Sequence, residues 1–336
     1  MNSFVLSIVI PTYSRAEKLN LLLFSLSNSF SVWPNGIEVV ILDNASTDNT
    51  AQIVSNFLDI IPIKYVRRPN NIGMDGNIAS CFDATSGKYL WILGDDEILY
   101  RNSLKYIFEI CSNNDFGILH LENGGFKSED EHIIGDLSIP EKPEIISLNS
   151  ELLFRNANIF LTFISANITN KLAVIKKFPD FNSKSDINTF LPQMAWTYSA
   201  LKAVDNHFFI RTPMFGALIG NTGGYKFIEV FGVNLINLTN KYFPLDTLKS
   251  TQIMSNAVIT RLIPGELIAQ FGKIGSKSNF TNEDINTAIY NSFGEKIYFK
   301  IFLKPILSNS LFLRKFFFIL VRVFNKLNKK MGFIFL

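Results

Sequence analysis

The sequence predicts an α/β fold built on a parallel sheet, followed by a helical, basic C-terminal extension. Strand and helix patterns alternate through the first 125 residues, as the crossover connections between parallel strands require. From residue 296 to the end, the chain has nine Lys or Arg and no acid, interleaved with bulky apolar side chains. With 336 residues and 47% apolar content, the chain is long enough to bury a large core.

The alternation in the first part is regular enough to place each element. The helix that follows the first strand has Leu19, Leu22, Leu23 and Leu26 on one face, which is the pattern of a helix packed on a sheet. Strands are expected at residues 4–10, 37–42, 63–66, 89–93 and 117–121. Helices are expected at residues 15–29, 48–58, 73–84 and 104–111.

The chain after Glu122 has a less regular pattern. Residues 127–144 are polar, acidic and proline-bearing, which indicates a surface loop or a break between two halves. Helices are expected at residues 151–163, 191–204 and 227–239, and a tight loop is expected at residues 221–225 (NTGGY). The sequence pattern of the helix expected at residues 191–204 also allows a start at residue 188.

The C-terminal segment from Lys296 carries the charge asymmetry of the chain. Nine of the 32 basic residues lie there, which leaves 23 basic against 29 acidic residues before it. Its longest apolar run, Phe316 to Val321, is far shorter than the roughly 20 residues that a spanning helix needs. The combination of basic and bulky apolar residues favours a helix that lies on an anionic membrane surface. Binding to nucleic-acid phosphates gains little from large hydrophobic side chains, so no nucleic-acid partner is expected. Packing of this helix on the domain is the structural alternative.

Cysteine and histidine usage indicates a cytoplasmic protein without a zinc site. Cys81 and Cys111 fall in apolar stretches and predict buried free thiols. The apolar start of the chain has no basic leader or cleavage site, so a first strand is expected there rather than a signal peptide. The histidines lack ligand spacing: His120, His132 and His207. We therefore expect a cytoplasmic protein that is peripheral on the inner face of the cell membrane.

Two polar turns, residues 11–15 (PTYSR) and 43–48 (DNASTD), follow the first two strands. The carboxyl ends of parallel strands meet at one edge of the sheet, so the two turns are expected to form one pocket. Tyr13 can stack on a base, Asp43 can accept hydrogen bonds from a base or ribose, and the helix amides that follow favour phosphate. Helix capping is the alternative role of residues 46–48.

A third turn, residues 70–77 (NNIGMDGN), follows the third strand. Asp75 and Asn77 are expected to complete the nucleotide pocket, and Arg67 or Arg68 can reach phosphate or base. Because Asn and Gly also suit left-handed turn conformations, a structural role is the alternative.

Three consecutive carboxylates follow the fourth strand, in the segment WILGDDE. Asp95, Asp96 and Glu97 would repel one another at the end of a buried strand unless a cation lay between them. A hard divalent cation, Mn²⁺ or Mg²⁺, takes oxygen ligands from one or two carboxylates and from a diphosphate. The turn therefore predicts a metal–diphosphate site, with a solvated acidic turn as the alternative.

These motifs resemble the GT-A, family 2 glycosyltransferases over residues 4 to about 112. SIVIPTYSR resembles the PTYNR opening of the family, VVILDNASTD its Asp-x-x-Ser-x-Asp segment, and GKYLWILGDDE its DxD region. NNIGMDGNIAS followed by WILGDDE is similar to a bacterial branch that builds O-antigens and capsules, including abequosyltransferase-like enzymes. The resemblance implies a GT-A domain over residues 1–225, with a nucleotide-sugar half at 1–122, an acceptor half at 123–225 and a helical region at 226–336.

The resemblance also implies the reaction, which is an inverting transfer of a sugar from a nucleotide-sugar donor to a glycan acceptor on a polyprenyl diphosphate lipid. Asp96 would bind Mn²⁺ or Mg²⁺ with help from Asp95 or Glu97. The donor residues would be Pro11, Thr12, Tyr13, Arg15, Asp43, Asn44, Asp75, Asn77 and Asp95. Two positions depart from the family pattern: Ser14 replaces the usual Asn, and Gly94 stands where many members have the first Asp of DxD.

The general base is the least determined part of the site. In the family it is an acid in a Glu-Asp pair that opens a helix roughly ninety residues beyond the metal motif, and this chain has no such pair at that distance. Asp186 is the closest positional match and Asp180 is second, although either can be a helix N-terminal acid. The missing pair leaves a catalytically silent nucleotide-binding or scaffold protein as one alternative. A sugar nucleotidyltransferase is another, but the chain lacks the Gly-rich, Arg-bearing loop that holds a triphosphate.

Overall fold

A computed structural model of the chain divides into two compact units, residues 1–220 and 221–336. The structure describes residues 4–126, 137–218, 225–244, 249–264, 267, 285–308 and 310–330. Most of the polar segment at 127–144, most of the tight loop expected at 221–225, and His132 lie outside these ranges.

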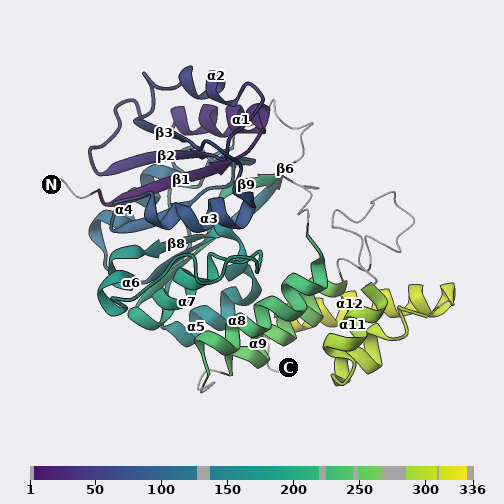
Figure 1. Ribbon diagram of the computed structural model, residues 1–336. Coiled ribbons are helices and arrows are strands. Elements are labelled where there is room, and N and C mark those ends of the chain that lie inside the picture. Colours follow the sequence, from purple (N-terminus) through teal and green to yellow (C-terminus); the bar gives the residue numbers. More distant parts are fainter. Residues whose placement is uncertain are drawn as a thin grey trace. The chain divides into compact units, whose positions relative to one another are not determined.

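The first unit is built on a mixed sheet, and the strands of the nucleotide half lie side by side in Figure 1. Four parallel strands form one part: β3 (Ile63–Arg67), β2 (Ile37–Asp43), β1 (Leu6–Thr12) and β4 (Tyr89–Ile92). The sheet continues through β8 (Asn167–Asn170), β6 (Ile118–Phe126), β9 (His207–Leu218) and β5 (Glu97–Leu99), and β7 (Ile145–Leu148) pairs with β9. The α/β prediction is confirmed.

Both faces of the parallel part are buried. Leu6, Ile8 and Ile10 of β1 pack into a core cluster with the leucine face predicted for the first helix. Ser7 and Val9, which point to the opposite face, are buried as well. A parallel sheet covered on both faces is the arrangement that crossover helices produce. The helices of this half are α1 (Ala16–Ser27), α2 (Thr50–Ser55), α3 (Gly73–Asp83) and α4 (Ser103–Asn113).

The second half of this unit differs more from the sequence prediction. The helix expected at 151–163 ends early: α5 (Ser150–Ala157) gives way to the 3-10 helix η2 (Asn158–Thr162), because Asn158 has a φ of 38°. The helix expected from residue 188 or 191 begins later, as α7 (Met194–Ala203), because Asn188 and Phe190 have φ of 73° and 59°. A further 3-10 helix, η3 (Ile164–Ala166), and α6 (Lys171–Lys177) flank β8.

The second unit is helical over its described residues. It contains α8 (Leu235–Tyr242), α9 (Ser250–Ala257), α11 (Ile285–Phe293) and α12 (Leu311–Lys330), with short π-helical segments at η4 (Glu229–Asn234), η5 (Val258–Leu262) and η6 (Phe299–Leu303). The long helix α12 is the yellow helix of Figure 1. Within the ranges described, no helix combines the length and apolar content needed to cross a membrane.

Candidate active site

The last residues of three neighbouring strands lie in one row at the carboxyl edge of the sheet. Thr12 of β1 pairs with Asp43 of β2, and Asp43 pairs with Arg67 of β3. The turns that follow these strands therefore start side by side, where ligands of open α/β sheets bind. Tyr13 follows Thr12 and is 45% exposed, so its ring is accessible from this edge.

Asp43 is fully buried and orders the turn that follows it. One carboxylate oxygen accepts a hydrogen bond from the Ser46 backbone N–H at 2.8 Å, and the other accepts one from the Tyr65 hydroxyl and lies 3.5 Å from Arg67 Nε. Burial raises the pKa of Tyr65, and the bond to Asp43 adds to the shift. Both oxygens of Asp43 thus have partners within the protein, and its contact with a nucleoside stays a prediction.

Two asparagines connect the second and third turns. Asn44 Nδ2 donates to Asn71 Oδ1 at 2.8 Å, and its Oδ1 accepts from the Ile72 backbone N–H at 3.0 Å. Asn77 on α3 donates to the Leu42 carbonyl at 3.1 Å and accepts from Arg68 Nε at 3.1 Å. These bonds hold the second and third turns together, so both asparagines have structural roles whatever they contribute to a ligand.

The acid turn, residues 95–97, lies at the end of β4 and contacts the first turn. Asp95 is 4% exposed; Thr12 Oγ1 donates to its Oδ2 at 2.8 Å and Arg15 donates to its Oδ1 at 2.7 Å. The same guanidinium lies 3.3 Å from Asp96 Oδ2. A charge-assisted bridge therefore joins the turn after β1 to the turn after β4, across about 80 residues of sequence.

Glu97 is held by a different partner and is the more unusual acid. Ser165 Oγ accepts from the Gly94 backbone N–H at 3.0 Å and donates to Glu97 Oε1 at 3.1 Å. The other oxygen, Glu97 Oε2, is buried and has no hydrogen-bond partner among the described residues. Burial, together with the neighbouring charge of Asp96, raises the pKa of Glu97 to about 9.

Asp95 also has a raised pKa, and the neighbouring Arg15 cation opposes the rise. Burial raises the pKa of Asp95, the charge of Arg15 lowers it, and that of Asp96 raises it again. The acid turn therefore holds buried carboxyl groups with raised pKa values, and a cation placed beside them would favour their ionised forms.

The two candidate bases lie on the chain segment before α7. Asp180 is exposed, and Asp186 is 3% exposed. Asp75 on α3 accepts from the Phe190 backbone N–H at 2.9 Å, while its Oδ1 is buried without a hydrogen-bond partner in the described part of the chain. Burial raises the pKa of Asp75. Asp75 thus connects the segment that carries Asp186 to the donor half.

Histidines and cysteines are structural where they are described. His120 bonds to Asn167 at 2.8 Å, and His207 accepts from the Ile118 backbone N–H at 3.0 Å through Nδ1. Burial lowers the pKa of each histidine to about 4, so both are neutral at pH 7. The prediction of buried free thiols is confirmed, since Cys81 and Cys111 are both buried and unpaired by disulfides.

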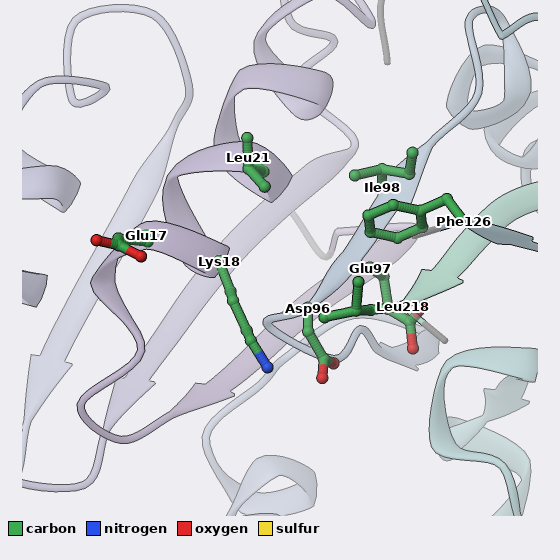
Figure 2. Close-up of a pocket in the computed structure, with 8 residues that line it drawn as sticks. All are labelled: Glu17, Lys18, Leu21, Asp96, Glu97, Ile98, Phe126 and Leu218. Carbon is green, nitrogen blue, oxygen red and sulfur yellow. The ribbon is translucent and has the colours of Figure 1, made fainter. Parts of the chain in front are cut away.

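A pocket of about 150 Å³ lies between α1, the acid turn and the ends of β6 and β9. Figure 2 shows its lining, with Lys18 extending from α1 toward the Asp96 carboxylate. The apolar part of the lining is Leu21, Ile98, Phe126 and Leu218, and the charged part is Glu17, Lys18, Asp96 and Glu97.

Residues 7–177, which contain the turns and the acid turn described above, match the family described as Glycosyl transferase family 2. The match covers just over half of the chain. The chain belongs to glycosyl transferase family 2. The resemblance found in the three sequence motifs is therefore confirmed, and so is the GT-A fold class.

Relatives of this family 2 glycosyltransferase align over parts of their length. Abequosyltransferase RfbV of Salmonella typhimurium is 38% identical over 102 residues, which is 30% of this chain and 30% of the relative. Chondroitin synthase of Escherichia coli is 43% identical over 63 residues, which is 19% of this chain and 9% of that enzyme. Among solved structures, residues 1–349 of TarS from S. aureus superpose with a TM-score of 0.58 at 16% identity, over 97% of this chain and 91% of that one.

The family implies a divalent cation, and the acid turn of the glycosyltransferase provides suitable oxygen ligands. A Cβ at Gly94 would lie 3.2 Å from both Asp96 Oδ1 and Glu97 Oε1, so glycine at this position leaves room for the two carboxylates. Glu97 Oε2 is buried and unsatisfied, whereas both Asp95 oxygens have partners. No group of three His, Cys, Asp or Glu side chains placed to hold a metal occurs in the described ranges. Asp96 and Glu97 therefore fit a cation that takes its other ligands from a diphosphate.

Some site residues of the glycosyltransferase gave no signal in the sequence. Ser165 lies 68 residues from Glu97 and reaches it only because β8, which follows Ser165, is the antiparallel neighbour of β4. Phe126 and Leu218 meet at the pocket through the pairing of β6 with β9. The bridge from Arg15 to the acids was also not predicted, because Arg15 was assigned to the donor alone.

Proposed function

We propose that this glycosyltransferase transfers a sugar from a nucleoside-diphosphate donor to a glycan acceptor with inversion, in the synthesis of a bacterial surface polysaccharide. The observation that carries the proposal is the buried acid turn, residues 95–97, joined by Arg15 to the turn after β1. This arrangement supports diphosphate binding because it positions carboxylates and a cation at the ligand-binding edge of the sheet.

The names of similar proteins support the donor class. Abequosyltransferase, chondroitin synthase and poly(ribitol-phosphate) β-N-acetylglucosaminyltransferase each transfer sugars, and TarS structures exist with UDP and with UDP-GlcNAc. A nucleotide sugar is accordingly the proposed donor. The proposed acceptor, a glycan on a polyprenyl diphosphate lipid, comes from the family resemblance of the sequence motifs alone.

In the proposed reaction, the acceptor hydroxyl oxygen forms a bond to the anomeric carbon of the donor sugar. The bond between that carbon and the diphosphate oxygen breaks, and the diphosphate leaves with the electron pair. Asp186 is the proposed acceptor of the hydroxyl proton, with Asp180 as the second candidate, because Asp75 ties the Asp186 segment to the donor half. Asp96, assisted by Glu97, would hold Mn²⁺ or Mg²⁺, which neutralises charge on the leaving diphosphate when bound.

Peripheral attachment to an anionic membrane is the second part of the proposal, and the described face of α12 supports it. Phe312 is 76% exposed, Phe316 48%, Ile319 62% and Val323 51%, at the spacing of one helix face. The segment from Lys296 onward carries nine basic residues and no acid. An exposed apolar face on a basic helix is the composition of an interfacial membrane helix.

A transfer assay tests the activity with a matched pair of variants. Wild-type protein, Asp96→Asn and Asp59→Asn, which changes an exposed acid, are incubated with Mn²⁺, a panel of UDP, GDP, CDP and dTDP sugars, and bacterial lipid-linked glycans. We expect product with the wild type and Asp59→Asn but none with Asp96→Asn. Full transfer by Asp96→Asn would contradict the assignment of the acid turn. Nucleotide binding without transfer would instead favour a silent binding protein, and pyrophosphate release a nucleotidyltransferase.

Sedimentation with vesicles tests the attachment. Full-length protein is expected to pellet with vesicles that contain phosphatidylglycerol, and a chain truncated before Lys296 is expected to stay in the supernatant. Equal pelleting of the two proteins would contradict the proposed attachment.

A further inference from the structure

Helix α3 holds the chain segment before α7 at two points. At the C-terminal end of α3, Asp83 accepts a hydrogen bond from Ser183 Oγ at 3.0 Å. In the first turn of α3, Asp75 accepts from the Phe190 backbone N–H at 2.9 Å. The segment that carries Asp186 is therefore tied to one helix on both sides of that residue.

The carboxylate of Asp75 faces three consecutive backbone N–H groups, which belong to residues 188–190. Burial raises the pKa of Asp75, and the N–H groups of Phe190, Asn188 and Thr189 oppose the rise. Successive N–H groups directed at one anion form a concavity that binds negative charge. Asp75 supplies that charge from within the chain, so its carboxylate stabilises this turn.

The turn at residues 188–190 contains left-handed backbone conformations. Asn188 has a φ of 73° and Phe190 a φ of 59°. Asparagine tolerates this region, but a bulky side chain such as phenylalanine rarely adopts it. Thr189 lies between them and donates from its hydroxyl to the Asp186 carbonyl at 2.6 Å. Strained backbone persists only where neighbouring contacts hold it, and the bond from the Phe190 N–H to Asp75 is such a contact.

The burial of two carboxylates makes the position of this turn important. Asp75 is 9% exposed; one of its oxygens bonds to Phe190, and the other, Oδ1, is buried. A carboxylate placed in this way acts on the neighbouring chain segment. Asp186 is 3% exposed, so the position of its backbone decides whether its carboxylate reaches an acceptor hydroxyl.

We propose that Asp75 is a positioning residue for the sugar transfer, which fixes the turn at residues 188–190, thereby holds Asp186 in place, and does not contact the donor. This role differs from the donor contact that the sequence resemblance implies for Asp75. The inference rests on the proposed function, in which Asp186 accepts the proton of the acceptor hydroxyl. A displacement of about 1 Å in a catalytic site can lower the rate about a hundredfold. Loss of the Asp75 carboxylate should therefore lower kcat and leave the nucleotide affinity unchanged.

Asp75→Asn in the full-length protein tests the inference, because it removes the charge at nearly constant size. Asp83→Asn is the matched control, since it makes the same substitution in the same helix at the contact with Ser183. Asn188→Val disturbs the turn independently, because Asn188 is exposed and a β-branched residue disfavours its left-handed conformation. Asn188→Gly is combined with Asp75→Asn as a rescue variant, since glycine adopts that conformation freely. Urea unfolding midpoints establish which variants are folded.

Three readouts separate positioning from donor binding. Amide hydrogen exchange of residues 186–191, measured by mass spectrometry without substrate, should be faster in Asp75→Asn and Asn188→Val than in the wild type and Asp83→Asn. Calorimetry with Mn²⁺ and UDP, GDP, CDP or dTDP should give affinities within about twofold of the wild type for every variant. The kcat of transfer should fall about tenfold or more in Asp75→Asn and Asn188→Val at an unchanged KM for the donor. Adding Asn188→Gly to Asp75→Asn should restore part of that kcat.

The outcomes distinguish this inference from the proposed function. A nucleotide affinity that falls about tenfold or more in Asp75→Asn would overturn the inference, because Asp75 would then contact the donor. A kcat in folded Asp75→Asn or Asn188→Val equal to that of Asp83→Asn would overturn it as well. If the wild type binds no nucleoside diphosphate and transfers no sugar, the proposed function fails, and the catalytic part of the inference fails with it. Faster exchange confined to Asp75→Asn and Asn188→Val would still support the contact that holds the turn.

Discussion

Removing the guanidinium of Arg15 should destabilise the fold more than removing an arginine with similar contacts elsewhere at the same sheet edge. In Arg15→Met, Asp95 loses its 2.7 Å charged partner and keeps only the 2.8 Å bond from Thr12. Removing one partner of a buried ion pair is unfavourable by about 3–5 kcal/mol. The Arg15 side chain is 32% exposed and Asp95 can take up a proton, so we expect a loss of about 2–3 kcal/mol in the free energy of unfolding.

The control for this prediction is Arg67→Met. Arg67 lies 3.5 Å from Asp43 and is 53% exposed, and Asp43 retains the Ser46 backbone N–H and the Tyr65 hydroxyl. The loss should therefore stay below about 1 kcal/mol, as for exposed ion pairs. Urea unfolding at pH 7 measures both variants. Equal losses, or a loss below about 1 kcal/mol for Arg15→Met, would refute the conclusion that Arg15 compensates the buried acid turn.

Three further predictions concern other parts of the chain. Because burial lowers the pKa of His120 and His207 to about 4 from 6.5, the folded protein binds fewer protons than the unfolded chain between these values. The free energy of unfolding should then fall as the pH drops from about 6.5 to 4, by at most about 3 kcal/mol per histidine. The fall should be smaller in His120→Gln than in the wild type, and a pH series with an equal fall in the two proteins would contradict the prediction. Asp75→Ala removes the acceptor of the Phe190 amide and should lower the unfolding free energy in urea by about 2 kcal/mol, whereas an unchanged midpoint would mean that the contact is not stabilising. Phe316→Glu on the exposed face of α12 should weaken binding to anionic vesicles about tenfold or more at an unchanged unfolding midpoint, and undiminished vesicle binding would rule out this face as the contact.

The parallel part of the fold was predictable because its signals are local. The apolar strands and the leucine face of α1 each occupy a short window of sequence, and the observed bounds differ from the expected ones by a few residues. The acid turn was predictable for the same reason, since its three carboxylates follow an apolar run directly. Local sequence patterns therefore predicted the strands and helices of the donor half and the position of the acid turn.

The remaining strands depend on partners that are distant in sequence. β9 contains Pro213 and Gly216, which interrupt a strand pattern, yet it forms because β5, β6 and β7 all pair with it. β8 has only four residues and lies between β4 and β6. The partners of Glu97 and the walls of the pocket arise from this pairing, so no local pattern indicated them.

The most direct test of the central claim is binding of a nucleoside diphosphate at the acid turn. Thermal unfolding of wild-type protein and Asp96→Asn would be recorded with Mn²⁺ and UDP, GDP, CDP or dTDP, since a ligand at about 100 times its dissociation constant stabilises by about 2.7 kcal/mol. We predict a rise in the unfolding temperature of the wild type with one nucleotide, and no rise in Asp96→Asn. No rise with any nucleotide in the folded wild type, or an equal rise in the variant, would contradict the claim.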